Sequence, residues 1–250
     1  MIEIKTSQDI MKIKKSCEIV AELLAEIELM IKPGISTIDL DIFAEIFIRK
    51  RKGVPAFKGY RNYPSTICAS INEVIVHGIP NEKKLKEGDI VGIDVGVILD
   101  GYYGDAAATF AVGKIEEKYL NLINVTKQSL YVGIEQAVEN KKIGDISHAI
   151  QEYVESRGYN VIRDFVGHGV GLRLHEEPKI PNYGEQNTGP RLRAGMVLAI
   201  EPMVCMGNYE VEILEDEWTA RTKDGSYAAH FEHTIVITND KPIILTQKQN

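Results

Sequence analysis

The sequence lacks the features that mark a secreted or membrane-embedded protein. It has only three cysteines, Cys17, Cys68 and Cys205, and they form no CxxC pair. An odd, widely spaced set excludes a disulfide framework or a zinc ribbon and is typical of a reducing compartment. No apolar run is long enough to cross a bilayer, and charges interrupt the N-terminal segment where a signal peptide needs an apolar stretch. We therefore expect a cytoplasmic protein with no membrane partner.

Positive charge is also scarce. The chain has 36 acidic and 29 basic residues, which gives a formal net charge of -7. Because phosphate backbones bind surfaces of positive potential, this balance predicts that nucleic acid is not a specific partner. The 250 residues are 44% hydrophobic, enough for one ordinary core, and no linker-like segment divides them. We expect a single catalytic domain over residues 1–250.

Periodic apolar positions predict two helices followed by strands in the first half. The first helix runs from Ser7 to the breaker pair Pro33-Gly34, and the second follows the capping pair Ser36 and Asp39. A strand is expected in residues 65–71. Residues 87–112 form two β-rich arms around Asp100-Gly101, a dipeptide that favours a tight hairpin because both central residues adopt positive φ.

The second half repeats this order. Helical patterns over residues 119–138 and 145–157 precede apolar strand runs at 196–204 and 230–238, which a turn-rich acidic stretch separates. Gly34 and Gly144 lie 110 positions apart, and Asp94 and Glu201 lie 107 apart. We interpret the chain as an α/β (α+β) domain of two pseudo-twofold halves, about 1–115 and 116–250, with antiparallel sheet and covering helices.

Four carboxylates fall in the strand runs. A two-residue loop at Asp100-Gly101 places Asp94 opposite Ala107 and therefore Asp105 diagonal to Asp94 on one face. Glu201 and Glu232 lie in the later, apolar runs. A single acid of this kind is more simply a strand-end or lysine-paired residue. Two unit charges 4 Å apart repel by roughly 4 kcal/mol at an effective dielectric near 20, so four clustered acids indicate bound cations or protonation.

His168 lies between glycines in VGHGVG, where backbone and ligand can approach closely. The segment has neither the spacing of a dinucleotide fingerprint nor the lysine of a P-loop. A lone histidine is more often structural. One imidazole with four carboxylates, however, suits a divalent pair such as Mn, Fe or Co and permits Zn. Such a pair can share a water, lower its pKa and hold the hydroxide for attack on a carbonyl, so hydrolysis is expected.

Six segments in this order resemble the signature of type I methionine aminopeptidases of the short, bacterial-type form. They are INEVIVHGIP, GIDVGVILDGYYGD, GHGVG, LHEEP, AIEPMV and FEHTIVIT, and the resemblance covers nearly the whole chain. It implies the pita-bread fold, a duplicated α/β half with two metal ions between the halves. It also implies removal of the initiator methionine from proteins and peptides, preferably when the second residue is small.

The resemblance assigns roles to individual residues. It implies that Asp94 chelates one metal, that Asp105 and Glu232 bridge both, and that His168 and Glu201 complete the other. Glu201 resembles the family's proton shuttle between the bridging water and the leaving amine.

The resemblance also implies a substrate cleft. It places His77 and His175 beside the substrate and the developing oxyanion. It assigns the methionine pocket to Tyr60, Tyr63, Cys68 and Trp218, where a thioether packs well against aromatic rings. Taken singly, these histidines and aromatics are as well explained as structural residues. Some family members have an aromatic residue where this chain has Leu174, which leaves the shape of the pocket open.

Three alternatives are weighed against this interpretation. Prolidases and aminopeptidase P share the fold but bring a large N-terminal domain that 250 residues do not hold. Type II methionine aminopeptidases carry a helical insertion before the last glutamate, whereas 30 residues separate Glu201 from Glu232. A non-catalytic binding protein on the same fold would have no use for an intact set of buried carboxylates.

The expected partners are N-termini of newly made proteins, and the expected state is a monomer. Metal identity and ribosome association stay open.

Overall fold

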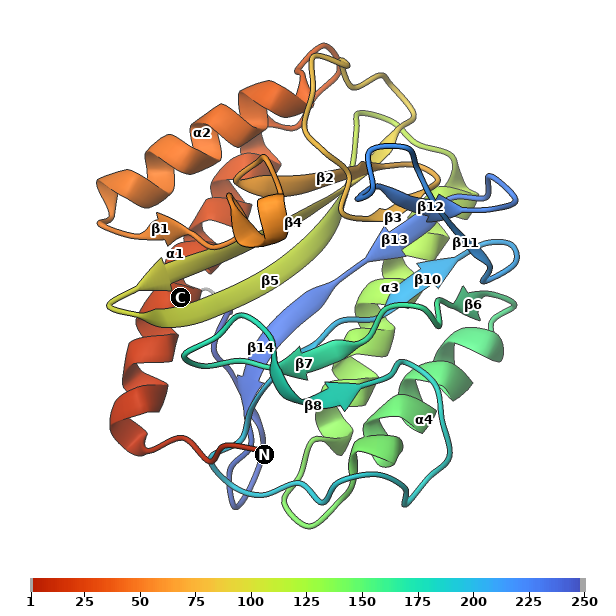
Figure 1. Ribbon diagram of the computed structural model, residues 1–250. Coiled ribbons are helices and arrows are strands. Elements are labelled where there is room, and N and C mark those ends of the chain that lie inside the picture. Colours follow the sequence, from red (N-terminus) through yellow and green to blue (C-terminus); the bar gives the residue numbers. More distant parts are fainter. Residues whose placement is uncertain (1, 248–250) are drawn as a thin grey trace.

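The computed structural model describes residues 2–247, in which pairs of helices alternate with groups of strands (Figure 1). The helices are α1 (Ser7–Met30), α2 (Thr37–Lys50), α3 (Glu117–Gln136) and α4 (Ile143–Glu155). The strands between α2 and α3 are β1 (Val54–Pro55), β2 (Ile67–Ile71), β3 (Val74–Val76), β4 (Ile90–Leu99) and β5 (Tyr102–Ala111), with a 3-10 helix at Tyr60–Asn62. The strands after α4 are β6 (Asn160–Val161), β7 (Gly167–Gly169), β8 (Glu176–Ile180), β9 (Val197–Ile200), β10 (Met203–Cys205), β11 (Val211–Ile213), β12 (Ala220–Thr222), β13 (Ala228–His230), β14 (Glu232–Val236) and β15 (Ile243–Ile244).

A nine-stranded antiparallel sheet joins the two parts of the chain. Its order is β1-β4-β5-β14-β9-β7-β8, with β2 paired to β4 and β15 paired to β14. The contact between β5 and β14 therefore connects the strands that follow α2 with those that follow α4. Two smaller sheets, β13-β10-β6 and β11-β12-β3, complete the strand pairing among the described residues.

The hairpin of β4 and β5 has the register expected from its turn. Asp100 and Gly101 both have positive φ, 51° and 81°, as a two-residue hairpin loop requires. Leu99 pairs with Tyr102, and Asp94 lies opposite Ala107. The predicted diagonal relation of Asp94 to Asp105 is thus confirmed.

The caps of the helices explain where they begin. Ser36 and Asp39 form the predicted capping box of α2. Helix α4 begins at Ile143, two residues before the predicted start, because Asp145 accepts a hydrogen bond from the Lys142 backbone N–H at 2.8 Å and so caps the helix from inside its first turn.

The two late strand runs are broken, which corrects one prediction. Residues 196–204 form β9 and β10, and Glu201 lies in the gap between them, not within a strand. Pro202 follows Glu201 and has no backbone N–H to donate to a ladder, so pairing stops here. Glu232 is the first residue of β14, after a second break at Phe231. The acidic stretch between these runs is partly ordered as the hairpin of β11 and β12.

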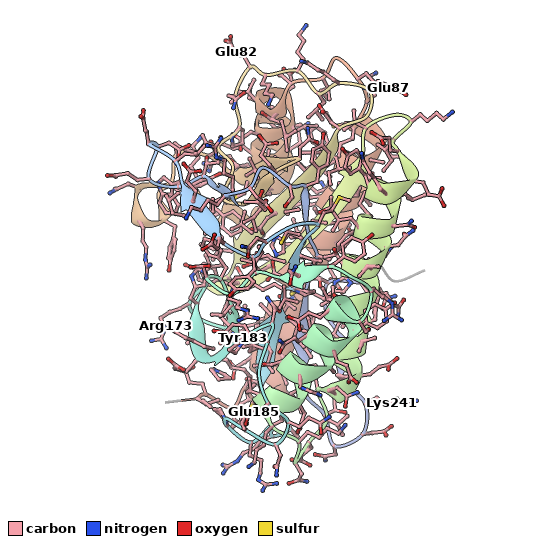
Figure 2. The ribbon with its side chains drawn as sticks, turned by 90° about the vertical axis from the view of Figure 1, so that its right-hand side faces the viewer. Glu82, Glu87, Arg173, Tyr183, Glu185 and Lys241 are labelled. Atoms are coloured by element: carbon pink, nitrogen blue, oxygen red, sulfur yellow. The ribbon has the colours of Figure 1, made fainter. Side chains whose placement is uncertain are left out.

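The helices pack on one face of the large sheet and bury a core in each part of the chain. Helices α1 and α2 pack on β2 and β4 around Val20, Leu40 and Ile93, and α3 and α4 pack around Leu130 and Ile146. In Figure 1 α1 and α3 pass behind the strands, and in the turned view of Figure 2 α3 lies on the right-hand side. The other face of the sheet is left free for a cavity. No helix of residues 2–247 has the length and apolar character needed to cross a membrane.

Candidate metal centre and active site

A cavity of about 300 Å³ opens on the face of the large sheet that the helices leave free. No residue of α1 to α4 lines it. Every residue predicted for the site lines this cavity: Tyr60, Tyr63, Cys68, His77, Asp94, Asp105, His168, His175, Glu201, Trp218 and Glu232. The structure thus brings together four stretches of the sequence, residues 60–77, 94–105, 168–175 and 201–232.

Sheet register aligns three of the carboxylates. Asp94 on β4 and Glu232 on β14 both lie opposite Ala107 on β5, which runs between the two strands. Residues opposite one another in neighbouring strands share a face, and so do residues two positions apart in one strand. Asp105 therefore projects to the same side as Asp94 and Glu232.

His168 brings an imidazole nitrogen to these acids from β7. Its Nδ1 is 3.0 Å from the Gly169 carbonyl oxygen, which can only accept, so Nδ1 donates and Nε2 keeps its lone pair. Nε2 lies 3.8 Å from Asp105 Oδ2 and 3.4 Å from Glu201 Oε1. One ligand atom each of Asp105, His168 and Glu232 lies within 4.8 Å of the others.

Without a bound cation, the surroundings of the four acids and of His168 favour the neutral form of each side chain. Burial raises the pKa of Asp94 to about 7. Burial and the neighbouring carboxylates raise the pKa of Asp105, Glu201 and Glu232 well above their ordinary values. Burial, and then His175, lowers the pKa of His168 to about 3. No lysine or arginine offsets the four acids, because none forms an ion pair with them within residues 2–247.

The cluster fits divalent metal ions. Asp94 Oδ1, Asp105 Oδ1 and Glu232 Oε1 are buried and lack a hydrogen-bond partner among the described residues. Buried polar atoms are nearly always satisfied, so their convergence indicates a ligand. Carboxylate oxygens with one neutral imidazole suit Mn, Fe, Co or Zn.

A second group of residues forms an aromatic wall beside the carboxylates. The rings of Tyr63 and Trp218 meet edge to face, with centroids 5.0 Å apart. The Tyr63 hydroxyl donates to the carbonyls of Ile67 and Gly78 at 3.0 and 3.1 Å, which fixes the ring. Cys68 is buried next to them, and burial raises the pKa of its thiol, so the sulfur is neutral.

The two predicted substrate histidines lie at this wall. Nδ1 of His175 is 2.9 Å from the Tyr60 hydroxyl, and its ring centroid is 4.3 Å from that of His168. His77 has a φ of 61°, and its ring packs edge-on against Trp218 at 6.0 Å. Burial, and then His175, lowers the pKa of His77 to about 4, so its imidazole is neutral at pH 7.

Sequence reasoning missed several residues of the cavity. They are Phe57, Arg61, Val76, Phe165, Val166, Met203 and His230. His230 stands out because its Nε2 is buried, lacks a partner among the described residues and lies 3.8 Å from Glu201 Oε2. It precedes Glu232 by two positions, so strand alternation could have placed it on the same side. Leu174, whose effect was left open, is buried in the cluster that contains Tyr63 and Cys68.

Comparison with known proteins defines the class to which this cavity belongs. The model of metallopeptidase family M24 matches residues 11–239, so the chain belongs to this family of metal-dependent peptidases. It is 52% identical to the methionine aminopeptidase of Clostridium acetobutylicum, over 98% of this chain and 99% of the relative. It is 50% identical to methionine aminopeptidase 1 of Bacillus subtilis, over 99% and 100% of the two chains.

Structural comparison gives the same result. The crystal structure of methionine aminopeptidase from Thermotoga maritima superimposes with a TM-score of 0.98 at 50% identity, covering 99% of this chain and 100% of that one. Within family M24, the chain belongs to the bacterial-type methionine aminopeptidases. The predicted family, the pita-bread fold and the assignment as a hydrolase are thereby confirmed.

Proposed function

We propose that this enzyme removes the N-terminal methionine from proteins and peptides, preferably when the second residue is small. The observation that carries the proposal is the convergence, beside the aromatic wall of one cavity, of buried carboxylate oxygens that lack a hydrogen-bond partner among the described residues. The relatives named above act on the same bond according to their names. N-termini of newly made proteins are the partners that this activity requires.

The metal centre in this proposal consists of Asp94, Asp105, His168, Glu201 and Glu232, which together would hold two divalent ions. Five ligands, four of them anionic, match the charge of two such ions. A bound pair supplies Lewis-acid activation of the scissile carbonyl and of the attacking water. The protein contributes the arrangement, because the sheet register and the Gly169 carbonyl fix the ligand atoms before metal binds.

The chain's own side chains then carry the substrate and the proton. Tyr60, Tyr63, Cys68 and Trp218 surround the methionine side chain, whose thioether packs against their rings and sulfur. Glu201 accepts the proton of the attacking water and hands it to the leaving amine, a transfer that needs a carboxylate close to both atoms.

His77 and His175 complete the cleft. A neutral imidazole has one donor and one acceptor nitrogen, and because Nδ1 of His175 already meets the Tyr60 hydroxyl, its Nε2 is the nitrogen left for the substrate. We assign to these residues the contacts with the peptide group and with the oxygen on which charge develops, since they flank the metal centre on the side of the aromatic wall.

The decisive test measures methionine release from Met-Ala-Ser with purified protein, with Mn, Co or Fe added and with excess chelator. Release that requires metal supports the proposal. Activity with Xaa-Pro peptides and none with Met-Ala-Ser would instead indicate a prolidase-like activity on this fold.

A further inference from the structure

The N-terminal segment before α1 reaches the turn that leads from β7 to β8 and carries His175. The Nζ of Lys5 donates to Glu176 Oε2 at 2.6 Å, although 171 positions separate the two residues. Their side chains are only 6% and 3% exposed. Lys5 also anchors its own backbone, because its N–H donates to the Gly195 carbonyl at 2.8 Å.

Glu176 also binds the backbone of the turn. Its other oxygen, Oε1, accepts hydrogen bonds from the backbone N–H groups of Leu172 and Arg173 at 2.9 and 3.1 Å. The Arg173 side chain itself points outward, on the side of the molecule away from α3 (Figure 2). The turn is therefore held from inside by one carboxylate. Its counter-charge is Lys5, whose Nζ also donates to the exposed Glu3 at 2.6 Å.

The turn packs closely against the Lys5 side chain. A Cβ added at Gly171 would lie 2.4 Å from the Lys5 Nζ and 2.8 Å from Glu176 Oε1. The Gly171 carbonyl in turn accepts from the Tyr103 N–H at 2.9 Å, which ties the same turn to β5. The ammonium thus fills a site formed by the turn.

We propose that Lys5 is a positioning residue for methionine removal: through Glu176 it fixes the turn of residues 170–175 so that His175 stays beside Tyr60 and His168. This inference rests on the proposed function. Without the ammonium, Glu176 becomes a buried carboxylate with two N–H donors and no counter-charge, a situation that is strongly destabilising. The turn then opens toward water, and His175, the residue directly before Glu176, moves with it. A displacement of about 1 Å in a group that contacts the reacting atoms is enough to lower the rate on the order of 100-fold.

The test compares Lys5→Met with Lys15→Met, which removes an exposed lysine of α1. Three quantities are measured: kcat and KM for Met-Ala-Ser with saturating Mn, bound metal per chain, and hydrogen exchange of the Leu172 and Arg173 amides. We expect Lys5→Met to lower kcat by about tenfold or more with KM changed less than about threefold. Metal content should stay the same, and the two amides should exchange faster. Lys15→Met should match wild type in all three.

Two further variants distinguish the proposed effect from a general loss of folding. Lys5→Met combined with Glu176→Gln removes the unpaired charge, and it should recover part of the lost kcat and of the amide protection. Gly171→Ala should lower kcat as well, because the added methyl meets both the lysine head and Glu176 Oε1 and so disturbs the same contact from the side of the turn.

The proposal is overturned if Lys5→Met keeps kcat within about twofold of wild type, or if kcat falls while both amides stay protected. If wild type itself releases no methionine with any metal, the proposed function fails. The amide exchange of the same variants would still show whether Lys5 fixes the turn.

Discussion

Nε2 of His168 lies 3.4 Å from Oε1 of Glu201, the distance of an ion pair, yet the surroundings disfavour the charged form of both groups. Burial lowers the pKa of the imidazole to about 3, and burial with repulsion from Asp94 raises the pKa of the carboxyl well above its ordinary value. A neutral imidazole offers its lone pair to a cation directly, and the protonated acids exchange their protons for it, since metal ligands must be deprotonated. The site is therefore built for a metal ion and against an internal ion pair.

Metal removal should abolish activity. We expect release of methionine from Met-Ala-Ser to disappear in excess chelator and to return with Mn, Co or Fe, because the carboxylates then have a cation to hold. Because metal binds the folded state and not the unfolded chain, it should also raise the free energy of unfolding, by about 2.7 kcal/mol when free metal is 100 times Kd. The melting temperature should rise accordingly. Full turnover in chelator with no metal detectable by elemental analysis would contradict the metal mechanism.

Stability of the metal-free enzyme should depend on pH through Asp94. Its pKa rises from 3.8 to about 7 on folding, so between these values the folded state binds more protons than the unfolded chain does. The free energy of unfolding due to this group therefore falls as pH rises from about 4 to about 7. Asp94→Asn has no such proton to lose, so it should stabilise the metal-free enzyme more at pH 8 than at pH 5, by about 3 kcal/mol, because about two pH units of the proton loss lie between these values.

Urea unfolding at both pH values, with chelator present, measures this difference. Histidines with a lowered pKa, such as His77, make the free energy of unfolding rise with pH. Wild type and variant share these histidines, so their contribution cancels in the comparison. Equal stabilisation at pH 5 and pH 8 would mean that Asp94 keeps an ordinary pKa.

Local patterns predicted the parts of the site that neighbours in sequence define. Asp94 and Asp105 could be placed on one face because a two-residue turn fixes hairpin register and strands alternate with period two. The capping box of Ser36 and Asp39 is equally local. The break at Glu201-Pro202 was missed although proline carries the signal for it, because the apolar run around it resembled one continuous strand.

Long-range contacts could not be predicted from the residues alone. The contact of Tyr60 with His175 joins residues 115 positions apart, and that of Lys5 with Glu176 joins residues 171 apart. Pairing between distant strands, of β5 with β14 and of β3 with β12, brings such segments together, and nothing in these strands specifies the partner of each. Resemblance to a family supplied this information for His77 and His175, but not for His230. The division into halves 1–115 and 116–250 stays a prediction, although the helix pairs bury separate cores.

Glu201→Gln should lower kcat far more than it changes KM. The amide binds metal less well and cannot carry the proton from the attacking water, while the aromatic wall of Tyr63 and Trp218 is left intact. We expect a loss of 100-fold or more, within the range of about 10²–10⁴ that general acid-base catalysis contributes. Glu185→Gln, at an exposed glutamate labelled in Figure 2, should behave as wild type. A kcat near wild type for Glu201→Gln would show that the role assigned to this residue is wrong.

Selectivity for methionine should depend on Cys68. Its buried thiol lies in the cluster with Tyr63, so Cys68→Ala enlarges the space there and should admit leucine and norleucine more readily. An apolar pocket discriminates by only about 1–3 kcal/mol per methylene-sized difference, so wild type should already cleave norleucyl-Ala slowly, and the variant should narrow the kcat/KM ratio of Met-Ala to Leu-Ala by about tenfold. Cys205→Ala is the matched control, because that thiol is equally buried but does not line the cavity. It should lower stability by a similar amount, since the same atom is lost from a buried position, and leave the ratio unchanged. Equal kcat/KM for Met-Ala and Leu-Ala in wild type would exclude this pocket as the source of selectivity, and an equal narrowing in both variants would trace the effect to general loosening of the fold.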